Sequence, residues 1–380
     1  MSALEKKWTL GLMSGTSIDG IDVAALHTDG EQSIAYGPTL FVPYENTFKQ
    51  RIKSILGSTE RNSSIDTIEK DLTNYHYKAV LSWLQENKFS SQDIDLIGFH
   101  GHTILHRSPK KYSPGRTWQI GNGQELADLL EIPVIGNLRE NDIQHGGEGA
   151  PLVPIFHQTL CASLLKPVAI FNIGGIANIT YVGEGQLIAF DTGPGNGLMD
   201  QSMEQHTGQF YDQDGSTARK GCVDSEWLKE QLQDPYFNIP PPKSLDRLDF
   251  NKLPTSLSLE DGMATLLSLT VESVAKSLMW VPIPPQLILI AGGGRRNTYL
   301  MEQLQKRLNP IQVLPIDTVD ASSDFLEAQA WAYLAKRSFN KLPITFPSTT
   351  GVKEPLTGGT LYYPQSNFQQ FSSHSLKISV

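Results

Sequence analysis

The chain has 380 residues, 39% of them hydrophobic and 19% charged, which is typical of a globular protein with room for two domains of moderate size. Its net charge of -9 at pH 7 disfavours nucleic acid as a partner, because an acidic surface repels phosphate backbones. Cys161 and Cys222 are too few cysteines for a disulfide-stapled secreted protein, so we expect reduced thiols and a cytoplasmic location. We expect no membrane partner, because prolines interrupt the most apolar run, Trp280 to Ala291.

The N-terminal part of the chain is expected to alternate strands and helices, as an α/β domain does. Strands are predicted from runs of β-branched and aromatic residues at 8–13, 21–27, 33–43, 95–101, 117–121 and 132–137. Helices are predicted at 45–57 and 64–87, with a short helix between the last two strands. Residues 140–152, rich in glycine and polar groups, are expected to form a loop. We therefore predict an N-terminal domain, 1–149, and a C-terminal domain, 150–380.

The C-terminal part begins with a strand, a glycine turn and a strand at 168–183, followed by a strand, a glycine loop and a helix start at 187–200. Proline-rich residues 234–256 are expected to be irregular. Later elements are a helix at 260–279, a strand, glycine turn and helix entry at 287–297, a strand at 311–316, and an amphipathic helix at 324–339.

One pattern occurs in both halves. The segments 8–26 and 168–183 each consist of an apolar strand, a turn of small residues and a second strand with alternating apolar positions. A duplicated hairpin, one in each half, predicts two similar α/β domains that face each other across a cleft.

The first glycine turn carries small residues, two hydroxyls and two carboxylates. It comprises Gly15, Thr16, Ser17, Ile18, Asp19, Gly20, Ile21 and Asp22. Small residues let backbone N–H groups approach phosphate oxygens, and Asp19 or Asp22 could hold a hydrated magnesium ion. A plain hairpin turn is the structural alternative, because Asp-Gly is a common hairpin signal. It is not a Walker loop, since no lysine follows the glycines.

Two further glycine turns are candidates for nucleotide binding. Gly174 and Gly175 form the tip of the second predicted hairpin, where a second phosphate loop is the functional interpretation. Gly292, Gly293 and Gly294 follow an apolar strand and permit close approach of a flat ligand such as adenine. Asn297 would cap the next helix or contact the nucleotide. A tight hairpin and a tight strand-to-helix turn are the structural alternatives.

Asp191 stands where an apolar strand gives way to a glycine loop, a place where active-site groups of α/β folds lie. An aspartate there can act as a general base on water or a hydroxyl. The structural alternative is a cap for the following helix. The glycines and proline after Asp191 restrict the backbone, which suits a positioned base, so we favour catalysis.

The sequence resembles the anhydro-N-acetylmuramic acid kinases. The similarity runs in order along nearly the whole chain, in blocks at 11–24, 98–107, 117–121, 146–157, 171–180, 190–196, 211–221, 234–244 and 292–297. The resemblance implies the fold of sugar kinases, actin and the heat-shock chaperones, with two α/β domains around an ATP cleft. It also implies that water opens the 1,6-anhydro bond of the sugar and that O6 receives the γ-phosphate of ATP, with Mg2+, in cell-wall recycling.

Through this resemblance, Arg139 is a candidate contact for the lactyl carboxylate, and Glu327 is a candidate contact for the sugar. The sequence departs from the family pattern at Asn137, where the family usually has an aspartate, and at Leu245 and Asp246. A kinase for a different amino sugar and a non-sugar ATPase of the actin type stay open as alternatives, because fold alone does not decide function. The chain could form a homodimer.

Overall fold

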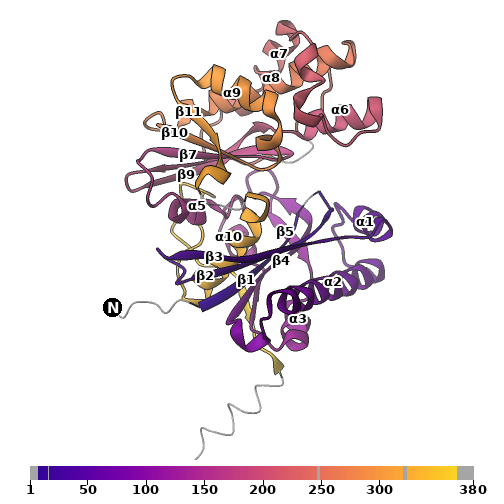
Figure 1. Ribbon diagram of the computed structural model, residues 1–380, viewed down its shortest axis with the longest axis vertical. Coiled ribbons are helices and arrows are strands. Elements are labelled where there is room, and N and C mark those ends of the chain that lie inside the picture. The colour runs from indigo at the N-terminus through magenta and orange to yellow at the C-terminus, as the bar shows by residue number, and fades with distance from the viewer. Residues whose placement is uncertain (1–6, 16, 246–248, 320–322, 366–380) are drawn as a thin grey trace, which may run out of the picture. The chain divides into compact units, whose positions relative to one another are not determined.

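The computed structural model describes residues 7–15, 17–245, 249–319 and 323–365 (Figure 1). Its contacts divide the chain into two compact units. The first runs through Thr159 and includes Phe325–Pro347 and the chain from Val352; the second comprises Leu160–Asp324 and Ser348–Gly351. Both units contain a mixed sheet with helices, which confirms the expected α/β class.

The first unit contains most of the expected N-terminal elements. Its strands are β1 (Lys7–Ser14), β2 (Gly20–Thr28), β3 (Ile34–Pro43), β4 (Leu96–Arg107), β5 (Arg116–Ile120), β6 (Val134–Gly136) and β12 (Thr360–Tyr362). Its helices are α1 (Asn46–Lys53), α2 (Ser63–Asn87), α3 (Gly123–Leu130), α4 (Glu140–Gln144), α10 (Leu326–Phe339) and most of α5 (Pro154–Leu160). The expectation of a loop at 140–152 was wrong at its start, where Glu140–Gln144 is helical.

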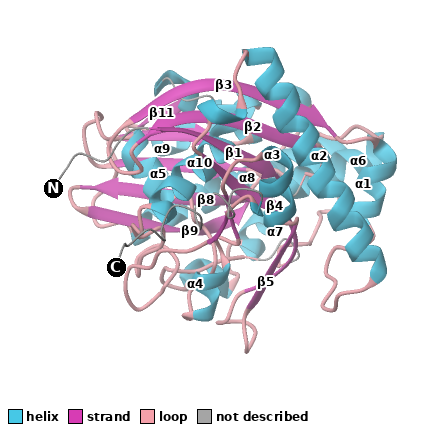
Figure 2. Ribbon diagram, turned by 90° about the horizontal axis from the view of Figure 1, so that it is seen from below, coloured by secondary structure: helices cyan, strands magenta, loops and turns pink. Residues whose placement is uncertain are grey.

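The sheet of the first unit has the strand order β12-β6-β4-β1-β2-β3, and β5 pairs with β4. Strand β2 pairs antiparallel with both β1 and β3, whereas β1 pairs with β4 and β4 with β6 in parallel. Alternate residues of each strand, such as Leu10 and Leu12, join the core formed with α2 and α3. Figure 2 shows these two helices beside the strands that they cover.

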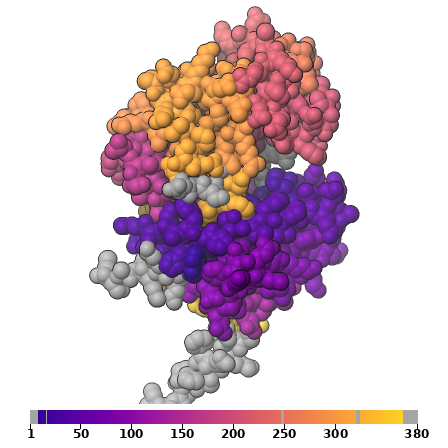
Figure 3. Space-filling model, in the orientation of Figure 1, coloured from indigo at the N-terminus to yellow at the C-terminus, as the bar shows by residue number. Residues whose placement is uncertain are grey.

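Helix α10 packs on the opposite face of this sheet, where two glycines create room for it. Gly11 and Gly98 are register partners on β1 and β4. A Cβ atom on Gly11 would lie 1.7 Å from the carbonyl oxygen of Ala328, and one on Gly98 would lie 2.2 Å from that of Trp331. The chain from Phe325 to Pro347 therefore groups with the first unit, which differs from the expected division at residue 149. A few yellow atoms of the C-terminal segment show at the edges of the indigo and purple atoms (Figure 3).

The second unit repeats this plan. Its strands are β7 (Val168–Ile173), β8 (Ile176–Gly183), β9 (Gln186–Pro194), β10 (Leu287–Ala291) and β11 (Gln312–Pro315), and its helices are α6 (Gly197–Thr207), α7 (Ser225–Gln231), α8 (Leu259–Ser277) and α9 (Thr298–Leu308). The order β11-β10-β7-β8-β9 has the same directions as β6-β4-β1-β2-β3. The core lies between the sheet and α6, α8 and α9.

The duplicated hairpins thus belong to two different sheets, β1–β2 in one and β7–β8 in the other. This confirms the prediction of two similar α/β domains drawn from the internal pattern of the sequence. Within the described residues, every helix is too short or too polar to cross a membrane.

Candidate active site

The first hairpin turn lies between β1 and β2 and is exposed at its polar side chains. The Ser17 hydroxyl donates a hydrogen bond to Asp19 Oδ1 at 2.7 Å, and both side chains are exposed. Ile18 has a positive φ of 56°, which is rare for a β-branched residue, and its side chain is only 2% exposed. The buried Ile18 therefore anchors a turn that presents Ser17 and Asp19 outward. Thr16 lies outside the described residues.

The strand end that precedes this turn is held by a buried chain of hydrogen bonds. The Tyr44 hydroxyl donates to Ser14 Oγ at 2.9 Å, and Ser14 Oγ lies 3.0 Å from His102 Nδ1. Burial lowers the pKa of His102 to about 4, so the ring is neutral near pH 7. The backbone N–H of Tyr44 also donates to the carbonyl of Asp19 at 2.9 Å. Sequence reasoning missed Tyr44 and Ser14, because they lie 30 residues apart.

The two candidate metal ligands lie at different points of the hairpin. Asp19 is in the turn itself, whereas Asp22 is half-buried on β2, where it pairs with Met13. Ile21, between them, is fully buried and belongs to the core rather than to a phosphate surface. No group of three or more His, Cys, Asp or Glu side chains within the described part of the chain is arranged to hold a metal by itself.

Arg139 precedes α4 and is clamped from three sides. Its Nε donates to His100 Nε2 at 3.2 Å, its Nη1 donates to the carbonyl of Gly149 at 2.8 Å, and its guanidinium carbon lies 5.2 Å from the centre of the Trp331 ring. Burial lowers the pKa of Arg139 to about 10, which still leaves it charged near neutral pH. No carboxylate of the described residues forms a salt bridge with it. A partly desolvated cation without a direct anionic partner is suited to an anionic ligand.

Glu327, the second candidate sugar contact, lies in the first turn of α10 with an exposed side chain. Although this side chain is accessible to solvent, the protein around it partly desolvates the carboxyl and raises its pKa, and the positive charge of Arg139 opposes that rise. The structure thus brings Glu327 and Arg139 within electrostatic reach, although they are far apart in the sequence.

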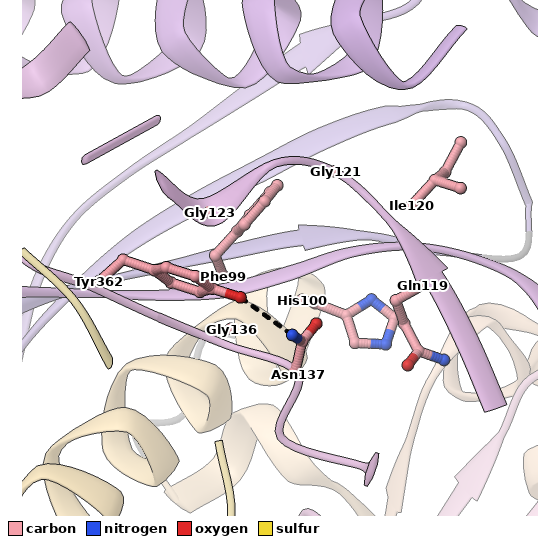
Figure 4. Close-up of a pocket in the computed structure, with 9 residues that line it drawn as sticks. All are labelled: Phe99, His100, Gln119, Ile120, Gly121, Gly123, Gly136, Asn137 and Tyr362. Atoms are coloured by element: carbon pink, nitrogen blue, oxygen red, sulfur yellow. Dashed lines mark hydrogen bonds between the residues drawn. The ribbon is translucent and has the colours of Figure 1, made fainter. Parts of the chain in front are cut away.

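A small cavity of about 10 Å³, roughly the size of one water molecule, lies near Arg139. Figure 4 shows Asn137 and Tyr362 pointing toward each other across it, with His100 and Gln119 beside them. Asn137 Nδ2 donates to the Tyr362 hydroxyl at 3.0 Å, and its φ of 55° is left-handed, a conformation that asparagine tolerates. The departure from the family pattern at Asn137 therefore falls at a left-handed backbone position that is tied to β12.

In the second unit, the tip of the hairpin is covered by the loop after β9. The amides of Gly195 and Gly197 donate to the carbonyl of Gly175 at 3.0 and 3.1 Å, and that of Asn196 donates to the carbonyl of Gly174 at 2.6 Å. A Cβ atom on Gly175 would have nothing within 4 Å. The turn thus keeps open space around its backbone while its carbonyls are already bonded.

The three glycines after β10 pack against the end of β7 and the loop after β9. A Cβ atom on Gly292 would lie 2.4 Å from Asn172 Oδ1, one on Gly293 3.4 Å from Asn196 Nδ2, and one on Gly294 2.6 Å from a methyl carbon of Ile173. Glycine is therefore required sterically at Gly292 and Gly294. Asn297 is the N-cap of α9 and accepts the amide of Leu300 at 2.9 Å, which was one of the two roles expected for it.

Asp191 lies within β9 and is held by a segment of the chain that sequence reasoning left without a role. The Leu245 amide donates to Asp191 Oδ2 at 2.8 Å, and the Asp191 amide donates to the carbonyl of Lys243 at 3.1 Å. The Tyr236 hydroxyl donates to the carbonyl of Asp191 at 2.5 Å. Helix α6 begins at Gly197 with Asn196 as its N-cap, so Asp191 does not cap it. Asp246 lies outside the described residues.

The family model for anhydro-N-acetylmuramic acid kinase matches residues 7–364. The anhydro-N-acetylmuramic acid kinase of Rhodospirillum rubrum is 44% identical over 362 residues, 94% of this chain and 94% of the relative. That of Nitrobacter winogradskyi is 42% identical over 370 residues, 93% of this chain and 99% of the relative. Among solved structures, the activator of the 2-hydroxyisocaproyl-CoA dehydratase from Clostridium difficile has a TM-score of 0.45 at 11% identity, covering 88% of this chain and 96% of that one.

The family match spans nearly all the described residues, and both relatives are covered almost end to end. The resemblance seen in the sequence blocks is thereby confirmed. The chain belongs to the anhydro-N-acetylmuramic acid kinase family.

Proposed function

We propose that this chain opens the 1,6-anhydro bond of anhydro-N-acetylmuramic acid with water and phosphorylates O6 from ATP, with Asp191 as the general base. As a member of its family, the chain is an ATP-dependent sugar kinase that acts in cell-wall recycling. The observation that supports Asp191 as the base is its setting. Its carboxylate is oriented by the Leu245 amide, it stands on β9, the strand that leads into the loop bonded to Gly174 and Gly175, and it does not serve as a helix cap.

The proposed reaction consists of one displacement at the anomeric carbon and one at the γ-phosphorus. Asp191 takes a proton from water, and the resulting hydroxide forms a bond to the anomeric carbon. The bond from that carbon to O6 breaks, and its electron pair stays on O6. O6 then forms a bond to the γ-phosphorus, and ADP leaves. Positioning and charge neutralisation supply most of the rate in phosphoryl transfer, so the chain mainly has to orient water, sugar and phosphate.

The hairpin turns are the proposed phosphate contacts. In the first unit these are Gly15, Thr16, Ser17 and Gly20; in the second they are Gly174 and Gly175, with Gly292 to Gly294 and Asn297 toward the nucleoside. Exposed hydroxyl and carboxylate groups at the first turn and open backbone at Gly175 support this assignment. Asp19 or Asp22 would hold Mg2+, since carboxylate oxygens suit that ion, and bound Mg2+ neutralises phosphate charge.

Arg139 is the proposed contact for the lactyl carboxylate, and Glu327 is a proposed contact for the sugar. The support for Arg139 is its clamped guanidinium, because two of its nitrogens are already fixed by His100 and Gly149. A planar guanidinium matches carboxylate geometry, and prior fixation reduces the entropy lost on binding.

The test is ADP release with and without the anhydro sugar, followed by the same reaction in ¹⁸O-labelled water. The proposal requires near-silence without the sugar and ¹⁸O at the anomeric carbon of the product. Label in the phosphate would contradict it. Equal turnover without sugar would favour an ATPase, and equal rates on N-acetylglucosamine or N-acetylmuramic acid would favour a kinase of different specificity.

Two further properties are proposed with the function. Cytoplasmic location is supported by Cys161 and Cys222, which are both free thiols. Homodimer formation stays a prediction, which light scattering on the purified chain can check.

A further inference from the structure

Lys243 is a buried lysine beside the proposed base. Lys243 is only 6% exposed. Lysine is almost never buried in this way without a partner for its charge. Its Nζ donates to the carbonyl of Tyr236 at 2.9 Å. It also lies over three aromatic rings, at 4.4 Å from the centre of Tyr236, 5.7 Å from Phe190 and 5.8 Å from Trp280. This arrangement is a cation–π cage around an ammonium group.

One segment contributes to the cage and also contacts Asp191. Residues Tyr236 to Leu245 supply the cage ring Tyr236, the ammonium itself, and each of the bonds from that segment to Asp191 described above. The backbone pairing of Asp191 with Lys243 fixes the two residues relative to each other. The fold therefore holds the backbone of Lys243 beside Asp191, and it holds the ammonium through the Tyr236 carbonyl and the three rings.

The charges around Lys243 indicate what its ammonium does. Burial and the neighbouring Lys276 on α8 lower the pKa of Lys243 to about 8, whereas the charge of Asp191 raises it. Among the described residues packed around it, Tyr236 and Trp280 contribute uncharged rings, and Asp191 is the carboxylate that favours the protonated lysine. Because electrostatic interaction is mutual, the ammonium favours the ionised carboxylate in return.

We propose that Lys243 is a positioning residue for Asp191, whose caged ammonium keeps the Asp191 carboxylate ionised while both substrates bring negative charge to the site. The inference rests on the proposed function, since a base must be ionised before it accepts a proton from water. ATP and the lactyl group are anionic, and nearby anions favour the protonated, inactive form of a carboxylate. Lys243 opposes that effect.

The test is the pH dependence of kcat and kcat/KM, from pH 5.5 to 9, for the wild type, Lys243→Met, Lys243→Gln and Lys243→Arg. Met and Gln remove the charge, and Gln keeps a donor for the Tyr236 carbonyl. We expect the acid limb of both neutral variants to move up by about one pH unit. On the acid limb their rate should fall by up to about tenfold at a given pH, while the rate at pH 8.5, where the carboxylate ionises without help, stays near wild type. Lys243→Arg should restore most of the acid limb.

Folding is monitored by denaturant unfolding on the same samples. If Lys243→Met fails to fold, Lys243→Gln and Lys243→Arg carry the comparison. An unmoved acid limb in a folded neutral variant, or a loss equal at every pH, overturns the inference. Asp191→Asn separates this failure from that of the proposed function. If Asp191→Asn is inactive and the limb is unmoved, only the role of Lys243 is wrong; if Asp191→Asn is active, both are wrong.

Discussion

The two sheets share one topology but differ at their hairpin tips. The β1–β2 tip exposes Ser17 and Asp19 above a buried Ile18, whereas the β7–β8 tip is bare glycine bonded to the loop after β9. Behind the tips, the first unit has a chain of buried polar side chains, and the second has the segment around Asp191. The comparison teaches that strand order sets where a turn lies, while the residues packed behind it set what the turn can present.

The largest expected difference is in acid stability, because neutral buried histidines gather in one unit. Burial lowers the pKa of His76 and His102 to about 4, of His157 to about 3, and of His100 well below its usual value. All four belong to the first unit. The unfolded chain protonates these rings below about pH 6.5, whereas the folded unit does not. The free energy of unfolding of the first unit should therefore fall by roughly several kcal/mol as the pH is lowered from 6.5 to 4.5.

Carboxyls of raised pKa act in the opposite direction, since the folded state then binds protons more readily. Burial raises the pKa of Asp200 in the second unit to about 6, and that of Glu327 is raised in the first. In the first unit the four histidines destabilise the folded state at acid pH more than Glu327 stabilises it. We therefore expect the first unit to unfold before the second as the pH falls. Hydrogen exchange by mass spectrometry at pH 7 and 5 can assign protection to each unit. Equal loss of protection in both would contradict the prediction.

The next effect is steric and separates two glycines. Gly11→Ala should lower the free energy of unfolding by about 3 kcal/mol, because its Cβ would lie 1.7 Å from the backbone oxygen of Ala328. Gly175→Ala is the matched control, since nothing lies within 4 Å of its Cβ. It should unfold like the wild type yet raise KM for ATP if the second tip contacts phosphate. Denaturant unfolding and steady-state kinetics measure both. Similar destabilisation of the two variants would refute the contrast.

Asp191→Asn tests the chemistry assigned to the second unit. It keeps the size of the side chain but removes the base, so kcat should fall by at least about a hundredfold, which is about 2.7 kcal/mol. KM for ATP should change little, because the turns are intact. Single-turnover phosphorylation and denaturant unfolding are measured on the same protein. Normal turnover at normal stability would exclude Asp191 as the base and direct attention to Asp19, Asp22 and Glu327.

The smallest effect concerns the support of the first tip. Tyr44→Phe removes the hydroxyl that donates to Ser14 and should cost about 1 kcal/mol of stability. If Ser14 also orients the turn after it, KM for ATP should rise while kcat changes little. The control is Tyr75→Phe, whose ring packs against Tyr44 in the same core without sharing this hydrogen bond. An identical KM in both variants would limit the Tyr44 bond to a structural role.

Much of the fold was predictable because its patterns are local. Apolar alternation and the 3.6-residue period identified most strands and helices within a few residues, and the repeated hairpin plan predicted two similar domains. The four glycine turns were found because glycine is the residue that tight turns and close approaches require. The order of the family blocks along the chain predicted the sugar kinase family. Each of these signals is carried by neighbouring residues, which share one backbone conformation.

What the sequence did not reveal depends on contacts between distant residues. Gly11 and Gly98 read as ordinary strand glycines until α10 packs on them, and that contact moves the chain from Phe325 to Pro347 into the first unit. Lys243 read as part of an irregular proline-rich segment until the fold enclosed it beside Asp191. Burial, and the pKa changes and hydrogen bonds that follow from it, arise when chain segments far apart exclude water together, and no local pattern of residues specifies which segments meet.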